Sequence, residues 1–166
     1  MRSSIVTALV IGTVLAIPAS SLSLAAGDRD ACSLLSATEV GAALGVTIGA
    51  GQHPASPLGG SGNLRTCQWY EPGKAGLQGK MVQIDIMGQI GSLSPVDRFN
   101  NAKRPVQNIM KTPVGGVGDD AYYIETPMFT SMNIRKGNSA FEIHVRGASD
   151  IKTVLKTLAQ EAVSKL

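Results

Sequence analysis

The segment from Phe129 to Arg146 constrains the fold most strongly, because apolar and polar side chains alternate along it on both sides of a turn. Alternation with a period of two is typical of β-strands that bury one face and expose the other. Gly137-Asn138 lies between the two arms and can supply the positive φ of a tight turn. We therefore predict a β-hairpin with a buried face formed by Met132, Ile134, Phe141, Ile143 and Val145.

The last segment, Ile151 to Leu166, has the pattern of a helix that could cover this face. Asp150 is suited to cap its first turn, and apolar residues follow at spacings of three and four. The apolar stripe consists of Ile151, Val154, Leu155, Leu158, Ala159, Ala162, Val163 and Leu166.

Five further elements are predicted between the N-terminus and the hairpin. Strands are expected at 64–70, 80–87 and 121–125, and short helices after the capping residues Ser36 and Ser94, ending at Gly45 and Pro105. The pattern at 106–112 leaves a helical turn and a short strand both open. The expected fold is α+β: an antiparallel β-sheet of about five strands with the N-terminal and C-terminal helices packed on it, an α/β sandwich.

Residues 1–25 have the composition of a secretory signal peptide. A short positive start precedes an apolar run, and Ser23-Leu24-Ala25 fits a small-x-small cleavage site. The run is short for a membrane span, although a retained N-terminal anchor is the alternative. We therefore predict an exported protein, periplasmic or extracellular, cleaved near Ala25, with residues 26–166 forming a single domain without a membrane span.

Two cysteines, Cys32 and Cys67, would remain after export. An oxidising compartment and an even count favour a disulfide, which would stabilise the domain by about 4 kcal/mol in the chain-entropy model. A metal site and a thiol nucleophile are the alternatives, which need further ligands or a partner histidine. Residues 46–63 between the cysteines are rich in Gly and Pro and predict a flexible loop, in which His53 would be solvated.

The charge pattern argues against nucleic-acid binding. Lys and Arg number 15 against 12 Asp and Glu, and the basic residues are scattered rather than clustered with aromatic residues. Residues 116–121, Gly-Val-Gly-Asp-Asp-Ala, match a dinucleotide-binding pattern, but the following Tyr122-Tyr123 favours a strand where that site requires a helix. We predict no cofactor. Asp119 and Asp120 could form a metal pair, but neighbouring side chains entering a strand point to opposite sides, so a turn role is favoured.

The polar face of the hairpin offers the remaining candidate site. Glu142, His144 and Arg146 share this face, and a Glu–His pair could serve acid–base chemistry if the fold supplied a nucleophile. Charged surface residues around a histidine are the simpler interpretation. If the hairpin is central and both of its faces are covered, this strip would become a binding groove. With Asp119 and Asp120, these residues form the possible binding surface.

The chain resembles the DUF3558-like proteins of the bacterial envelope. The resemblance rests on Ala31-Cys32-Ser33-Leu34-Leu35-Ser36, on Cys67-Gln68-Trp69, and on the segment 116–122. It implies an antiparallel sheet covered by helices, similar to Mog1/PsbP-like folds, and a cystine between the two cysteine motifs. Many members of this group are lipoproteins, whereas the charged residues that precede Cys32 do not fit a lipidation site. The group brings no common ligand and no catalytic residues.

These observations predict a non-enzymatic binding or accessory domain of the bacterial cell envelope, with an envelope protein or component as its partner. A small periplasmic hydrolase using His144 is one alternative. A periplasmic inhibitor or immunity protein acting through the loop 46–63 is another.

Overall fold

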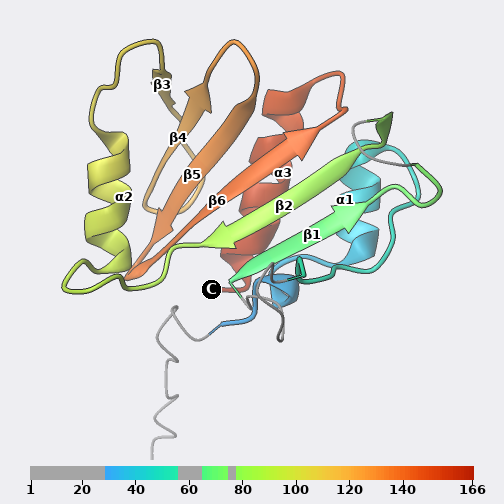
Figure 1. The fold of residues 1–166 in the computed structure, drawn as a ribbon, viewed down its shortest axis with the longest axis horizontal. Coiled ribbons are helices and arrows are strands. Elements are labelled where there is room, and N and C mark those ends of the chain that lie inside the picture. Colours follow the sequence, from blue (N-terminus) through green and yellow to red (C-terminus); the bar gives the residue numbers. More distant parts are fainter. Residues whose placement is uncertain (1–28, 56–64, 75–77) are drawn as a thin grey trace, which may run out of the picture.

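The computed structural model describes residues 29–55, 65–74 and 78–166, which form a six-stranded antiparallel sheet with helices on both faces (Figure 1). The strand order is β1-β2-β6-β5-β4-β3. The strands are β1 (Thr66–Tyr70), β2 (Met81–Ile86), β3 (Met110–Pro113), β4 (Asp120–Glu125), β5 (Thr130–Lys136) and β6 (Ser139–Arg146). The helices are the 3-10 turn η2 (Ala31–Ser33), α1 (Ala37–Leu44), α2 (Pro95–Lys103) and α3 (Ile151–Ser164). The fold is thus α+β, as predicted, with one more strand than expected.

The predicted hairpin forms the centre of the sheet. Strands β5 and β6 pair through a tight turn in which Gly137 has a φ of +57°, and β2 and β4 flank them. Residues 106–112, left open by the sequence, form an isolated bridge between Val106 and Ile109 followed by the edge strand β3. Strand β3 is therefore the one strand beyond the five that the sequence predicts.

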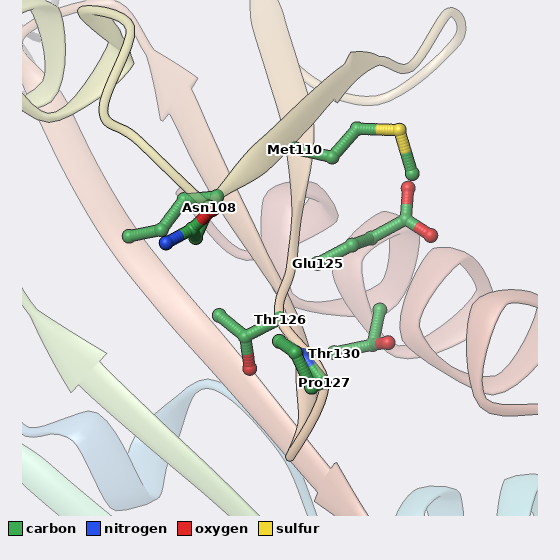
Figure 2. Close-up of a pocket in the computed structure, with 7 residues that line it drawn as sticks. Asn108, Met110, Glu125, Thr126, Pro127 and Thr130 are labelled. Atoms are coloured by element: carbon green, nitrogen blue, oxygen red, sulfur yellow. The ribbon is translucent and has the colours of Figure 1, made fainter.

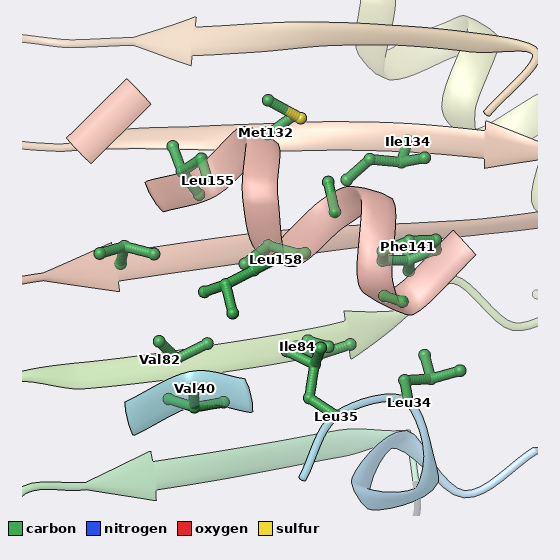
Figure 3. Close-up of a cluster of buried hydrophobic side chains, with 14 of the residues drawn as sticks. Leu34, Leu35, Val40, Val82, Ile84, Met132, Ile134, Phe141, Leu155 and Leu158 are labelled. Carbon is green, nitrogen blue, oxygen red and sulfur yellow. The ribbon is translucent and has the colours of Figure 1, made fainter. Parts of the chain in front are cut away.

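Helices α1 and α3 cover one face of the sheet, behind the strands in Figure 1. A capping box between Ser36 and Glu39 starts α1, and Gly45 ends it with a φ of +68°. The side chain of Asp150 caps α3, which ends at Ser164, two residues before the predicted end. Figure 3 shows the core between these helices and the sheet, where Leu155 and Leu158 of α3 meet the hairpin; its labelled members are Leu34, Leu35, Val40, Val82, Ile84, Met132, Ile134 and Phe141.

Helix α2 covers one end of the opposite face. Phe99 of α2 packs on Tyr122 of β4 with ring centroids 5.2 Å apart, next to Ala140. This cover changes the environment of the hairpin's polar face, which the sequence pattern predicts to be wet. Ser131 and Asn133 lie on that face, yet they are 0% and 1% exposed. The pattern identifies the face correctly but gives no sign of the second, smaller core.

The disulfide prediction is confirmed, because the Sγ atoms of Cys32 and Cys67 are 1.96 Å apart. It joins the turn before α1 to the middle of β1. Trp69, two residues further along β1, is 1% exposed in the same core. Gly51 lies against both: a side chain there would meet the indole nitrogen at 2.6 Å and the Cys67 sulfur at 2.8 Å.

Part of the predicted flexible loop lies along the edge of the sheet. Gly49 and Gln52 form backbone hydrogen bonds with Tyr70 and Gln68 of β1. The section 56–63 of the predicted loop lies outside the described residues, as does the predicted signal peptide 1–25.

Candidate functional site

The candidate site is the part of the sheet, on the face opposite α1 and α3, that no helix of residues 29–55, 65–74 and 78–166 covers. Every second residue of β1, β2 and β6 points to this face, and α2 covers only the end near β4. We call this surface the open face. It consists of Thr66, Gln68 and Tyr70 of β1, Met81, Gln83 and Asp85 of β2, and Glu142, His144 and Arg146 of β6. The buried Ser131 of β5 lies at its border, next to His144 in the register.

A chain of hydrogen bonds crosses the open face and ends at Asp85. The Tyr70 hydroxyl donates to Gln68 Oε1 at 2.7 Å, and Gln68 Nε2 donates to Gln83 Oε1 at 2.6 Å. Gln83 Nε2 then donates to Asp85 Oδ2 at 2.6 Å, while Thr66 donates to Asp85 Oδ1 at 2.7 Å. Each glutamine donates through its Nε2 to the next side chain, so the chain of hydrogen bonds ends at the carboxylate of Asp85, which is the terminal acceptor.

Glu142 is a second terminal acceptor, directly opposite Asp85 in the sheet register. The Ser131 hydroxyl donates to Glu142 Oε1 at 2.6 Å. His144 Nε2 lies between the two carboxylates, 3.3 Å from Glu142 Oε1 and 3.9 Å from Asp85 Oδ2. The ring of Phe129, 49% exposed, lies 6.1 Å from the ring of His144 by centroids.

The positive charge of protonated His144 and the negative charge of ionised Glu142 stabilise each other. Burial alone would lower the pKa of His144, but the hydrogen bond and charge of Glu142, with the charge of Asp85, outweigh it and raise that pKa above its usual value. Burial likewise opposes ionisation of Glu142, but His144 and the Ser131 hydroxyl outweigh it and hold the pKa of Glu142 below its usual value.

This arrangement differs from that of a hydrolytic triad. In a triad the hydroxyl donates to the histidine, and the carboxylate binds the other ring nitrogen. Here Ser131 donates to the carboxylate itself, and Ser131 is completely buried. In this geometry the Ser131 hydroxyl is therefore bonded to Glu142 rather than to His144, and its burial separates it from solvent.

The other predicted site residues do not all join this cluster. Arg146 lies one step further along β6, with its Nε 3.4 Å from the carbonyl of Gly79. Asp119 and Asp120 lie near the β5–β6 turn, at the opposite end of the hairpin from His144.

Each of the two aspartates has a partner far from it in the sequence, rather than its own backbone as the predicted turn role implies. Asp119 accepts from the Gly137 N–H at 2.7 Å, a bond that holds the pKa of its carboxyl below the usual value with help from Lys136. Asp120 forms an ion pair with Lys103 of α2 at 2.7 Å.

The glycines of segment 116–121 serve the turn into β4 rather than a helix. Gly118 has a φ of +58°, and a side chain there would lie 2.4 Å from the carbonyl oxygen of Arg135. The dinucleotide pattern therefore has no structural counterpart at this position.

His53 does not have the solvated position that the sequence suggests. Its Nδ1 lies 2.8 Å from the carbonyl oxygen of Thr66 and its Nε2 lies 3.2 Å from the carboxylate of Asp30. Cys32 Sγ is 3.8 Å from Nδ1, so Asp30, Cys32 and His53 form a cluster of metal-ligand types. The sulfur is bonded to Cys67, however, and a disulfide sulfur is not a thiolate ligand.

A shallow pocket of about 510 Å³ lies at the end of the sheet, between the start of β3 and the β4–β5 turn (Figure 2). Its lining residues are Asn108, Ile109, Met110, Glu125, Thr126, Pro127 and Thr130. Glu125 is held there by Lys152 at 2.8 Å and by Thr112 at 2.9 Å. The pocket thus lacks a free charged group that could select a ligand.

Sequence reasoning identifies the His144–Glu142 pair but misses the partners from β1, β2 and the β4–β5 turn. The alternation in β2 places Gln83 and Asp85 on a polar face, yet only the strand order shows that this face continues that of β6. Phe129 carries no signal beyond its position before a strand.

Comparison with known proteins yields no relative. No protein-family model, curated protein or solved structure matches the chain. Within residues 29–55, 65–74 and 78–166, no helix is both long and apolar enough to span a bilayer.

Proposed function

We propose that the protein is an exported, non-enzymatic binding domain of the bacterial cell envelope, and that its ligand binds to the open face. The observation that carries this proposal is the row of polar side chains that crosses β1, β2 and β6 without a covering helix. A rigid sheet holds these groups in place before a ligand arrives, which reduces the entropic cost of binding.

The geometry around His144 favours binding over hydrolysis. Its Nε2 is directed at carboxylates, and the buried hydroxyl of Ser131 is engaged by Glu142. The inhibitor alternative receives less support, because the described part of its proposed loop, 46–55, is hydrogen-bonded along β1 through Gly49 and Gln52.

Export, signal cleavage near Ala25 and the envelope location are parts of this proposal. The disulfide between Cys32 and Cys67 is compatible with an oxidising compartment. The resemblance to DUF3558-like proteins suggests the same location.

Capture from an envelope extract tests the proposal. The processed protein serves as bait, with Gln83→Lys as the variant that obstructs the open face and Gln160→Lys as the matched control on the exposed side of α3. We expect a partner to be retained by the wild type and the control and lost by Gln83→Lys. Equal retention by all three would place the binding surface elsewhere.

An activity screen separates the hydrolase alternative. We expect no turnover of ester, amide or phosphate substrates by the wild type. Turnover that disappears in His144→Ala would refute the binding-domain proposal.

A further inference from the structure

Two carboxylates of the open face lie side by side with one imidazole between them. Asp85 and Glu142 lie directly opposite each other on neighbouring antiparallel strands, a position in which like charges destabilise the sheet. His144 is the group between them, and one imidazole can offer at most one positive charge to two carboxylates. Both carboxylates also remain accessible, with side chains 35% and 23% exposed. The pair therefore has capacity for a further cation.

A buried acceptor without a donor lies in the same row of the sheet. Asn133 is directly opposite Glu142 in the register and is 1% exposed. Its Nδ2 donates to the Tyr122 hydroxyl at 3.0 Å, but its Oδ1 has no hydrogen-bond partner among the residues that the structure describes. A buried polar atom of this kind is costly unless a donor reaches it, directly or through water. In the row Asp85–Glu142–Asn133, the carboxylates accept from Thr66, Gln83 and Ser131, whereas Asn133 Oδ1 is an acceptor without a donor.

An exposed aromatic ring lies beside this row. Phe129, which directly precedes β5, is half exposed next to His144, on the side of Glu142 away from α2. An aromatic ring near carboxylates suits an alkylammonium group, since the ring contacts the methylene stem and attracts the positive head. Neutral hydroxyl-bearing ligands would gain less from the two negative charges.

We propose that the Asp85–Glu142 pair recognises a primary ammonium group on an alkyl chain, such as a lysine-type side chain of an envelope peptide, with Phe129 against the stem. This inference rests on the proposed binding function and names the chemistry of its ligand. His144, when protonated, occupies the same negative field and competes with the ligand. Removing its charge should therefore strengthen binding, which a purely supporting role for His144 does not predict.

The test is an NMR titration of the processed protein with two matched probes. Nα-acetyl-lysine methylamide carries the free ammonium, and its Nε-acetylated twin has the same backbone and stem without the charge. We expect the first probe to shift the amide signals of β2 and β6 around Asp85 and Glu142, and the second to leave them unchanged. N,N′-Diacetylchitobiose, called chitobiose below, serves as the neutral sugar probe.

Variants assign the effect to the proposed groups. Glu142→Gln and Asp85→Asn should each weaken binding about tenfold or more, because each removes a charged acceptor. Glu161→Gln, which removes an exposed carboxylate on α3, should leave affinity unchanged, and His144→Gln should tighten it. If the NMR spectrum of Glu142→Gln shows that this variant does not fold, the loss of affinity is measured with Asp85→Asn instead.

Three results would overturn the inference: equal binding of the two lysine probes, binding of chitobiose alone, or no binding of any probe. Weaker binding by His144→Gln than by the wild type would also contradict it. In each of these cases, continued capture of an envelope partner that is lost in Gln83→Lys would leave the proposed function standing.

Discussion

Reduction of the disulfide should destabilise the domain by an amount that follows from its position in the chain. Cys32 and Cys67 are separated by 35 residues. The chain-entropy model then assigns about 4 kcal/mol to the bond, because the reduced unfolded chain regains the freedom that the loop closure removes. For a domain of this size, a loss of about 4 kcal/mol corresponds to a fall in Tm of roughly 10–15 °C.

The native contacts around the bond place a fluorescent reporter next to it. The bond holds η2 and the start of α1 against β1, and Trp69 lies buried next to Cys67. Trp69 is the only tryptophan in the chain, so its fluorescence reports on this region alone. We expect the fluorescence transition to move with the circular dichroism transition, because α1 and α3 share one core.

The assay is thermal melting with and without a dithiol reductant, with thiol titration to confirm that both sulfurs are free. The Cys32→Ser/Cys67→Ser double variant is the control: its Tm should match that of the reduced wild type and should not respond to reductant. A shift below about 2 °C with both thiols free would refute the entropic reasoning.

Three further predictions concern the core, a turn and the open face. Leu158→Ala, at a fully buried position on α3, should cost about 2–5 kcal/mol in urea melts, and a cost below about 1 kcal/mol would show that α3 is peripheral. Gly118→Ala should destabilise by more than about 1 kcal/mol, because the new Cβ meets the carbonyl of Arg135 at a positive φ; an unchanged urea midpoint would contradict this. Because the pKa of His144 is raised in the folded state, its contribution to stability is fully present below the unfolded pKa of 6.5 and is lost as the pH rises through its folded pKa. Because the pKa of Glu142 is lowered in the folded state, its contribution to stability is fully present above the unfolded pKa of 4.5 and is lost as the pH falls through its folded pKa. Stability from this pair should therefore be greatest between pH 4.5 and 6.5. The free energy of unfolding that His144→Gln loses in urea melts should decrease as the pH rises from 6.5 through the folded pKa of His144, and a loss that stays constant over that range would contradict this.

The sequence predicts local structure well where one residue type has one clear role. Ser36 and Glu39 form the expected capping box, and Gly45 ends α1 as expected. The alternation in the hairpin places Ile134 and Ile143 in the core. Each of these features depends on neighbours only a few residues away, which a pattern can capture.

Local sequence patterns do not predict features that depend on residues far apart in the chain. The burial of Asn133 follows from α2 folding over one end of the sheet, and β3 becomes a strand because β4 offers it a free edge. The candidate site has the same limit: Glu142 and His144 are two residues apart and recognisable, whereas Asp85 joins them only through the pairing of β2 with β6.

The segment 49–53, which lies along β1, affects whether the sheet can associate edge to edge with another copy of the protein. An unpaired edge strand is a template on which a second molecule can extend the sheet. Gly49, Gln52 and His53 occupy outward-facing backbone groups of β1, and the disulfide fixes the middle of that strand to η2. At the other edge, β3 has only four residues and ends at Pro113, which has no N–H to donate. Both borders of the sheet thus discourage growth into a fibre.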